Sequence, residues 1–150
     1  MTDVPILICY DGTADSERAI ETAQDLLGPR RAVVLNVGPT LTTAESFAAM
    51  SSVVPGTAFE ELNVDDARRL ADAGAERARH AGFEAEARGE VGAPTWEGIL
   101  DVADEIDASV IVLGSRGLKG LRERVEGSVS HELAQHSRRP VLIVPPGSDS

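Results

Sequence analysis

The sequence predicts an α/β fold, in which helices cover both faces of a five-stranded parallel sheet with strand order 3-2-1-4-5. Two observations support this doubly wound architecture. Five short apolar runs alternate with four helix-like segments along the 150 residues, as in consecutive βαβ units. Runs such as residues 109–113 are apolar and β-branched nearly throughout, as expected of strands buried on both faces. Right-handed crossovers then produce the doubly wound sheet.

The first strand is predicted at residues 5–10, and either Thr13 or Asp15 can cap the helix that follows. Gly28 and Pro29 should end that helix. The second strand is predicted at residues 32–37, an apolar run interrupted only by Asn36.

Residues 40–57 form the least certain stretch, because Pro55 and Gly56 break any continuous helix. This segment should lie over the carboxyl end of the sheet. A lid over a ligand and a merely variable surface connection are both open interpretations.

A long helix is predicted from residue 58 to about residue 80, ended by Gly82. The pattern that supports it comprises Phe59, Leu62, Leu70, Ala73 and Arg77. The third strand follows at residues 83–91, where apolar and charged side chains alternate and Gly89 keeps the inward phase. Such alternation favours an edge strand with one wet face.

Pro94 suits the first position of the next helix. One face of that helix carries the apolar residues Trp96, Ile99, Leu100, Ala103 and Ile106, with Trp96 expected in the core. The fourth strand is predicted at residues 109–113, a helix at residues 129–135, and the fifth strand at residues 141–144.

Composition restricts the possible functions. With 42% hydrophobic and 26% charged residues, the chain is expected to form one globular domain over residues 1–150, with disordered ends at about 1–3 and 147–150. The formal charge of −11 argues against nucleic acid and anionic lipid as partners. No window approaches the ~18–20 apolar residues that span a bilayer. The first residues lack the features of a secretory signal, so we expect a cytoplasmic protein.

A candidate anion site follows the fourth strand. Gly114 and Gly117 are followed by Gly127 and Ser128 at the start of a predicted helix. Strand, glycine-rich loop and helix N-terminus direct free N–H groups toward one anion. Four basic side chains lie within the nine positions from residue 116 to residue 124: Arg116, Lys119, Arg122 and Arg124. The alternative, that these glycines serve only a turn in a solvated basic loop, is open as well.

Topology points to the same loop independently. In the order 3-2-1-4-5 the strand order reverses between the first and fourth strands, and ligands bind at such switch points. Asp11, Gly12 and Thr13 leave the first strand there, and Gly114 leaves the fourth.

The sequence gives little support to a P-loop, a dinucleotide-binding motif, a metal site or a catalytic nucleophile. The chain contains neither a Gly-x-x-x-x-Gly-Lys-Ser/Thr string nor a Gly-x-Gly-x-x-Gly string. The histidines His80, His131 and His136 have no metal-ligand spacing and are interpreted as surface or capping residues. Cys9 lies in an apolar run and is expected to be a buried small hydrophobe. Ser128 has no identifiable neighbouring base, so no catalytic residue is assigned.

The chain resembles universal stress proteins of the UspA family over nearly its whole length. The resemblance rests on the signature Gly114, Gly117, Gly127 and Ser128 and on the segments 4–13, 110–117 and 140–144. It implies a flavodoxin-like, adenine nucleotide alpha hydrolase-like fold, and the intact glycine signature implies the ATP-binding branch. Asn36 stands where a histidine is frequent in the family, and Ser109 where an aspartate is common.

The resemblance also implies roles for particular residues. Asp11 should lie beside the nucleotide, Val37 should meet adenine through its backbone, and Gly114 and Gly117 should border ribose and phosphates. Gly127 and Ser128 should hold the outer phosphates. On chemical grounds, the Ser128 hydroxyl should either donate to a phosphate oxygen or help to ligate Mg²⁺ held by that phosphate. The whole implied set is Asp11, Val37, Gly114, Arg116, Gly117, Gly127, Ser128 and Val129.

The resemblance further implies a homodimer in which the last strands pair through Val141, Leu142, Ile143 and Val144. An apolar edge strand would otherwise be exposed.

The leading functional hypothesis is an ATP-binding, nucleotide-responsive stress or signalling protein. Two alternatives are a slow ATPase or phosphotransferase, with Asp11 or Glu126 near the phosphates, and a dimerising scaffold without nucleotide.

Overall fold

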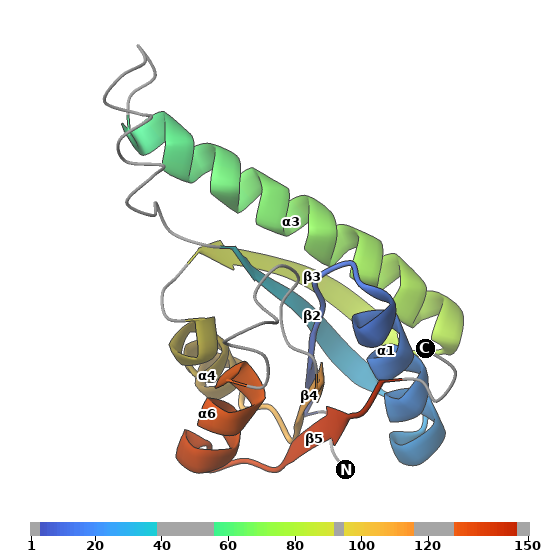
Figure 1. Cartoon of the computed structure of the whole chain (residues 1–150). Coiled ribbons are helices and arrows are strands. Elements are labelled where there is room, and N and C mark those ends of the chain that lie inside the picture. The colour runs from blue at the N-terminus through green and yellow to red at the C-terminus, as the bar shows by residue number, and fades with distance from the viewer. Residues whose placement is uncertain (1–3, 39–55, 92–94, 116–127, 147–150) are drawn as a thin grey trace.

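The computed structural model describes residues 4–38, 56–91, 95–115 and 128–146. Its centre is a five-stranded parallel sheet with the order β3-β2-β1-β4-β5 (Figure 1). The strands are β1 (Ile6–Cys9), β2 (Arg31–Gly38), β3 (Glu84–Val91), β4 (Ile111–Gly114) and β5 (Val141–Val144). The predicted fold class and strand order are therefore confirmed.

Helices cover both faces of this sheet. Helices α1 (Ala14–Leu27) and α3 (Gly56–Ala81) lie on one side, and α4 (Thr95–Ile106) and α6 (Ser128–His136) lie on the other (Figure 1). Along each strand, successive side chains point to opposite faces. Ile6, Ile8 and Val34 therefore pack in the core beneath α1 and α3, whereas Leu7 and Leu35 pack beneath α4 and α6.

The first helix begins where the sequence predicts. Thr13 is the N-cap of α1, and its hydroxyl accepts a hydrogen bond from the Ser16 N–H at 3.2 Å. Of the two predicted caps, Thr13 is correct and Asp15 lies inside the first turn. Gly28 ends the helix with φ of 76°, a conformation that glycine adopts without a Cβ clash.

The buried stripe of α3 differs from the predicted one. Within residues 64–81 the helix buries small residues: Ala67, Ala71, Gly74, Ala75 and Ala78. Leu70, part of the predicted pattern, is 38% exposed, and Ala73 and Arg77 are exposed too. The reason is close packing: a Cβ on Gly89 of β3 would lie 2.5 Å from the backbone nitrogen of Arg68. The predicted Phe59 and Leu62 have side chains outside the described part of the chain.

The α4 helix keeps its predicted apolar face only in part. Ile99 and Ala103 are buried, but Trp96 is half-buried and not a core residue. Its indole stacks on the imidazole of His136 at the end of α6, with ring centroids 4.6 Å apart. Pro94, the predicted helix start, lies outside the described residues.

The two edge strands have different surfaces. β3 alternates exposed or half-buried charged residues with smaller ones, as predicted for a strand with a wet face. β5 is apolar, and Ile143 is 37% exposed. Among the described residues no helix is both long and apolar enough to cross a bilayer.

Candidate functional site

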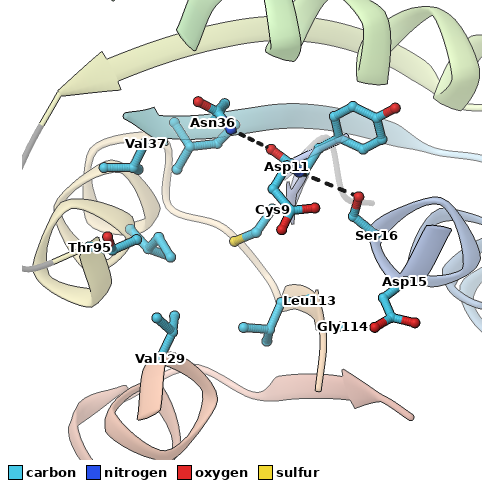
Figure 2. Close-up of a pocket in the computed structure, with 13 residues that line it drawn as sticks. Cys9, Asp11, Asp15, Ser16, Asn36, Val37, Thr95, Leu113, Gly114 and Val129 are labelled. Carbon is cyan, nitrogen blue, oxygen red and sulfur yellow. Dashed lines mark hydrogen bonds between the residues drawn. The ribbon is translucent and has the colours of Figure 1, made fainter. Parts of the chain in front are cut away.

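A pocket opens at the carboxyl ends of β1, β2 and β4, at the predicted switch point of the sheet (Figure 2). The position follows from topology, because the connections after β1 and β4 leave the sheet in opposite directions and part from one another there. The residues that line the pocket are Cys9, Tyr10, Asp11, Asp15, Ser16, Leu35, Asn36, Val37, Thr95, Ile99, Leu113, Gly114 and Val129.

One wall of the pocket is apolar. Its side chains come from the sheet face beneath α4 and α6 and from those two helices (Figure 2). They are Leu35, Val37, Ile99, Leu113 and Val129. Such a wall suits a flat, weakly polar group, because ligand pockets are mainly apolar with a few polar groups that set orientation.

The opposite wall is polar and belongs to the connection from β1 into α1. Asp11, Asp15 and Ser16 line it, and Figure 2 places Asp15 beside Gly114. A Cβ on Gly114 would lie 3.2 Å from the Asp15 carbonyl oxygen. The glycine therefore allows the end of β4 to approach the first turn of α1 closely.

Hydrogen bonds fix the Asp11 carboxylate in this wall. Its Oδ1 accepts from the Thr13 N–H at 3.0 Å and from the Thr13 hydroxyl. The Ser16 hydroxyl donates to the Thr13 carbonyl at 2.9 Å. These bonds form an Asx-type turn that continues into the helix cap, so the carboxylate is positioned before any ligand arrives.

The first turn of α1 is a poor site for an anion. Thr13 caps it, and the turn carries the carboxylates of Asp15 and Glu17. The first turn of α6 carries no acidic residue, so the positive end of that helix dipole is not compensated by a carboxylate of its own. The first turn of α4, which begins at the pocket residue Thr95, carries the carboxylate of Glu97. Of the three helix N-termini at the pocket, α6 is therefore the one suited to phosphate.

Asn36 connects β2 to the end of β1. Its side chain is 6% exposed, and its Nδ2 donates to the Tyr10 carbonyl at 2.8 Å (Figure 2). Tyr10 is held from the other side too, since its hydroxyl donates to Glu17 at 3.4 Å. Burial, together with the charge of Glu17, raises the pKa of the Tyr10 hydroxyl.

Cys9 lines the pocket and is half-buried, so it is less buried than the sequence predicts. Loss of water around the sulfur, with a smaller contribution from Asp11, raises the pKa of the Cys9 thiol to about 12. The group is therefore a neutral thiol at physiological pH and a weak nucleophile.

The structure brings together four of the predicted site residues: Asp11, Val37, Gly114 and Val129. Arg116, Gly117 and Gly127 lie outside the described residues, as do the rest of the basic cluster, Glu126 and most of the 40–57 segment. Ser128 begins α6, but its side chain is also outside them.

Sequence reasoning missed several polar residues of the pocket, among them Asp15, Ser16, Asn36 and Thr95. Asn36 had a visible signal, because it is the single polar residue in an apolar strand. Asp15 was considered only as a helix cap.

The histidines match their predicted surface role. His80, His131 and His136 are all exposed, and the Nε2 of His136 lies 3.1 Å from a Glu132 carboxylate oxygen. Within the described ranges, no group of three or more histidine, cysteine, aspartate or glutamate side chains could hold a metal ion.

Comparison with known proteins agrees with this fold. The model of the universal stress protein family matches residues 5–145. The universal stress protein YxiE of Bacillus subtilis is 34% identical over 144 residues, which cover 93% of this chain and 97% of YxiE. The chain belongs to the universal stress protein family.

Solved structures show the same architecture. The hypothetical protein MJ0577 superposes with a TM-score of 0.75 at 21% identity, covering 99% of each chain. A universal stress protein in complex with cAMP has a TM-score of 0.65 at 25% identity, covering 93% of this chain and 95% of its own. The universal stress protein of Archaeoglobus fulgidus in complex with dAMP has a TM-score of 0.64 at 21% identity, with 94% and 97% coverage.

Proposed function

We propose that this universal stress protein binds an adenine nucleotide, ATP with Mg²⁺, in the pocket at the ends of β1, β2 and β4, and acts in the cytoplasm as a nucleotide-responsive stress or signalling protein. The observation that carries the proposal is the two-sided pocket, whose apolar wall faces a polar wall at the switch point of the sheet. Two structural relatives are complexes with cAMP and dAMP, which supports adenine as the base.

The proposed orientation follows from the two walls. The base would pack on the apolar side, where Val37 contributes both a buried side chain and main-chain polar groups at the end of β2. Asp11, on the polar side, would accept from ribose hydroxyls. The phosphates would then extend toward the N-terminus of α6, with Gly114 leaving room at the narrow point.

Mg²⁺ fits the oxygen donors of the polar wall. It prefers carboxylates, phosphates and water, and Asp11 and Asp15 supply carboxylates there. Because the Asp11 Oδ1 already accepts two hydrogen bonds, we expect the ion to be held mainly by nucleotide phosphates, with Ser128 as an additional candidate. Bound there, Mg²⁺ would neutralise phosphate charge.

Slow hydrolysis is the second candidate. Asp11 is the pocket carboxylate that could act as a general base. However, its Oδ1 already accepts two hydrogen bonds from Thr13 that stabilise the turn. Without a poised base or an arginine finger, a bound triphosphate should turn over slowly. Single-turnover phosphate release that is unchanged in Asp11→Asn and Arg124→Ala would reject catalysis by these residues.

The proposed partner is a second copy of the chain. β5 is an edge strand with an exposed apolar side chain at Ile143, and an unpaired strand edge of this kind is usually covered. Sedimentation of the protein and of Ile143→Lys tests the pairing. If the wild type and Ile143→Lys both sediment as monomers, the proposed pairing through β5 is contradicted.

Calorimetric titration with ATP and Mg²⁺ tests the binding proposal. Gly127→Val should weaken affinity at least tenfold, because a branched side chain directly before the first residue of α6 would block approach of the phosphates. Ala134→Val, at an exposed position of the same helix, is the matched control and should bind as the wild type does. Equal ATP affinity in all three proteins would show that Gly127 does not belong to the binding site. If the wild type does not bind ATP, the alternative of a dimerising scaffold without nucleotide is favoured.

A further inference from the structure

The end of β1 is held by an unusual combination of contacts centred on one residue, Tyr10. Its N–H donates to the Leu35 carbonyl at 2.9 Å, whereas its own carbonyl accepts from the side chain of Asn36 at 2.8 Å. A side chain of β2 thus makes a bond to Tyr10 one residue beyond the end of β1 at Cys9.

The side chain of Tyr10 is equally constrained. Its ring packs so closely on α3 that a Cβ on Gly74 would lie 2.6 Å from it. Its hydroxyl reaches Glu17 of α1, which also pairs with Arg77 of α3 at 3.2 Å. The peptide between Tyr10 and Asp11 is held through both of its polar groups: the carbonyl accepts from Asn36 at 2.8 Å, and the N–H donates to the Ser16 hydroxyl at 3.4 Å. Because the Asn36 bond is the shorter of the two and is buried, it is the stronger constraint on the plane of this peptide.

We propose that Asn36 is a positioning residue for the nucleotide pocket: by binding the Tyr10 carbonyl, it holds the Asp11 turn in the geometry that receives the ligand. This inference rests on the proposed nucleotide binding. Asn36 acts through the backbone, and Asp11 is the group that would touch the nucleotide.

Burial makes this bond consequential. Asn36 is 6% exposed, so water cannot readily replace its amide as the donor to the Tyr10 carbonyl. A buried carbonyl without a donor is costly, and the chain can relieve that cost by rotating the peptide toward solvent. Such a rotation moves Asp11, which lines the polar wall of the pocket, together with the turn to Thr13.

The test uses two variants and a matched control. Asn36→Asp preserves the size of the side chain and removes the donor, and Asn36→Ala removes both. Ser109→Ala is the control: its hydroxyl also bonds to a carbonyl of the first-strand segment, that of Pro5 at 3.4 Å, but at the opposite end of the sheet. All three should lose some stability.

Two measurements are made on each protein well below its unfolding temperature. The first is ATP affinity by calorimetry, which should fall about tenfold in both Asn36 variants, the effect of one buried hydrogen bond to a carbonyl, and should stay unchanged in Ser109→Ala. The second is hydrogen exchange without nucleotide, in which the Thr13 amide should exchange about tenfold faster in the Asn36 variants while amides of α6 are unaffected.

The outcomes separate the two proposals. If the wild type binds ATP and both Asn36 variants bind it equally well, Asn36 does not position the site. If the wild type binds no nucleotide, the proposed function fails. The exchange measurement still tests the positioning role of Asn36, because unchanged protection of the Thr13 amide in the Asn36 variants overturns that role. Equal loss of affinity in Ser109→Ala would also overturn it, because general destabilisation would then explain the effect.

Discussion

The ring of Tyr10 packs directly on the backbone of Gly74, and a Cβ on that glycine would lie 2.6 Å from the Cγ and Cδ2 atoms of the ring. Real side chains do not approach so closely, so the residue on α3 must be glycine for Tyr10 to keep its place. Because Tyr10 directly precedes Asp11, a contact inside the core beneath α1 and α3 determines where the polar wall of the pocket begins.

Replacing Gly74 by alanine should therefore destabilise the fold. We expect a loss of about 1–3 kcal/mol in the free energy of unfolding, typical of overpacking a filled core, despite the better helix propensity of alanine. Urea unfolding measures it. Ala73→Ser, exposed on the same turn, should change stability by less than about 0.5 kcal/mol. Equal effects in the two variants would show that the contact is not tight.

Arg139 joins the end of α4 to the start of β5. Its guanidinium donates to Asp107 at 2.9 Å, to the Ala108 carbonyl at 2.8 Å and to Asp104 at 3.1 Å. Since both carboxylates are largely exposed, Arg139→Ala should cost only about 1 kcal/mol. Thermal unfolding in low and high salt should show that the difference from wild type shrinks as salt screens the pairs. Arg138→Ala, at the exposed neighbouring position, is the control, and a matching loss there would contradict the account.

The ion pair between Arg88 and Glu105 should make the free energy of unfolding depend on pH. A hydrogen bond from Arg88, 2.7 Å away, lowers the pKa of Glu105 below its ordinary value of 4.5. The pair therefore contributes stability above pH 4.5, and this contribution is lost as the pH falls through the lower pKa of the folded state. In Arg88→Ala the carboxyl resonance of Glu105 should titrate at a higher pH. An unchanged midpoint would show that Arg88 does not act on Glu105 in solution.

Cys9 should be slow to react despite lining the pocket. With the thiol pKa raised to about 12, almost no thiolate exists at pH 8, so the folded protein should react with Ellman's reagent far more slowly than the urea-unfolded chain. The raised pKa also means that burial of the neutral thiol stabilises the fold below pH 9.0, the ordinary value, and less as the pH rises above it. Rapid labelling of the folded protein at pH 8 would contradict the raised pKa.

The architecture was accessible from sequence because it depends on periodicity. Apolar runs and helical faces predicted the strands and helices, and right-handed crossovers in a doubly wound sheet predicted the strand order. The bounds predicted for the fifth strand, residues 141–144, match β5. A pocket lies at the switch point that this strand order defines, because a switch point follows from strand order alone.

Two details that depend on close contacts between backbone and side chains could not be predicted from the sequence. The buried stripe of α3 consists of alanine and glycine because Gly89 and the Tyr10 ring bring backbone and side chain against the helix, and a search for large apolar residues favoured Leu70 instead. The role of Asn36 was missed because its partner, the Tyr10 carbonyl, is a backbone atom. Side-chain patterns do not reveal backbone partners.

The measurement that tests the central claim most directly is an amide NMR titration of the ¹⁵N-labelled protein with ATP and Mg²⁺. Binding in the pocket predicts that the resonances of Asp11, Val37, Gly114 and Val129 shift together and saturate with one dissociation constant. Amides at the other end of the sheet, such as those of Asp107 and Ala108, should remain in place. Shifts confined to that far end, or none at all at millimolar ATP, would contradict the assignment of this pocket to an adenine nucleotide.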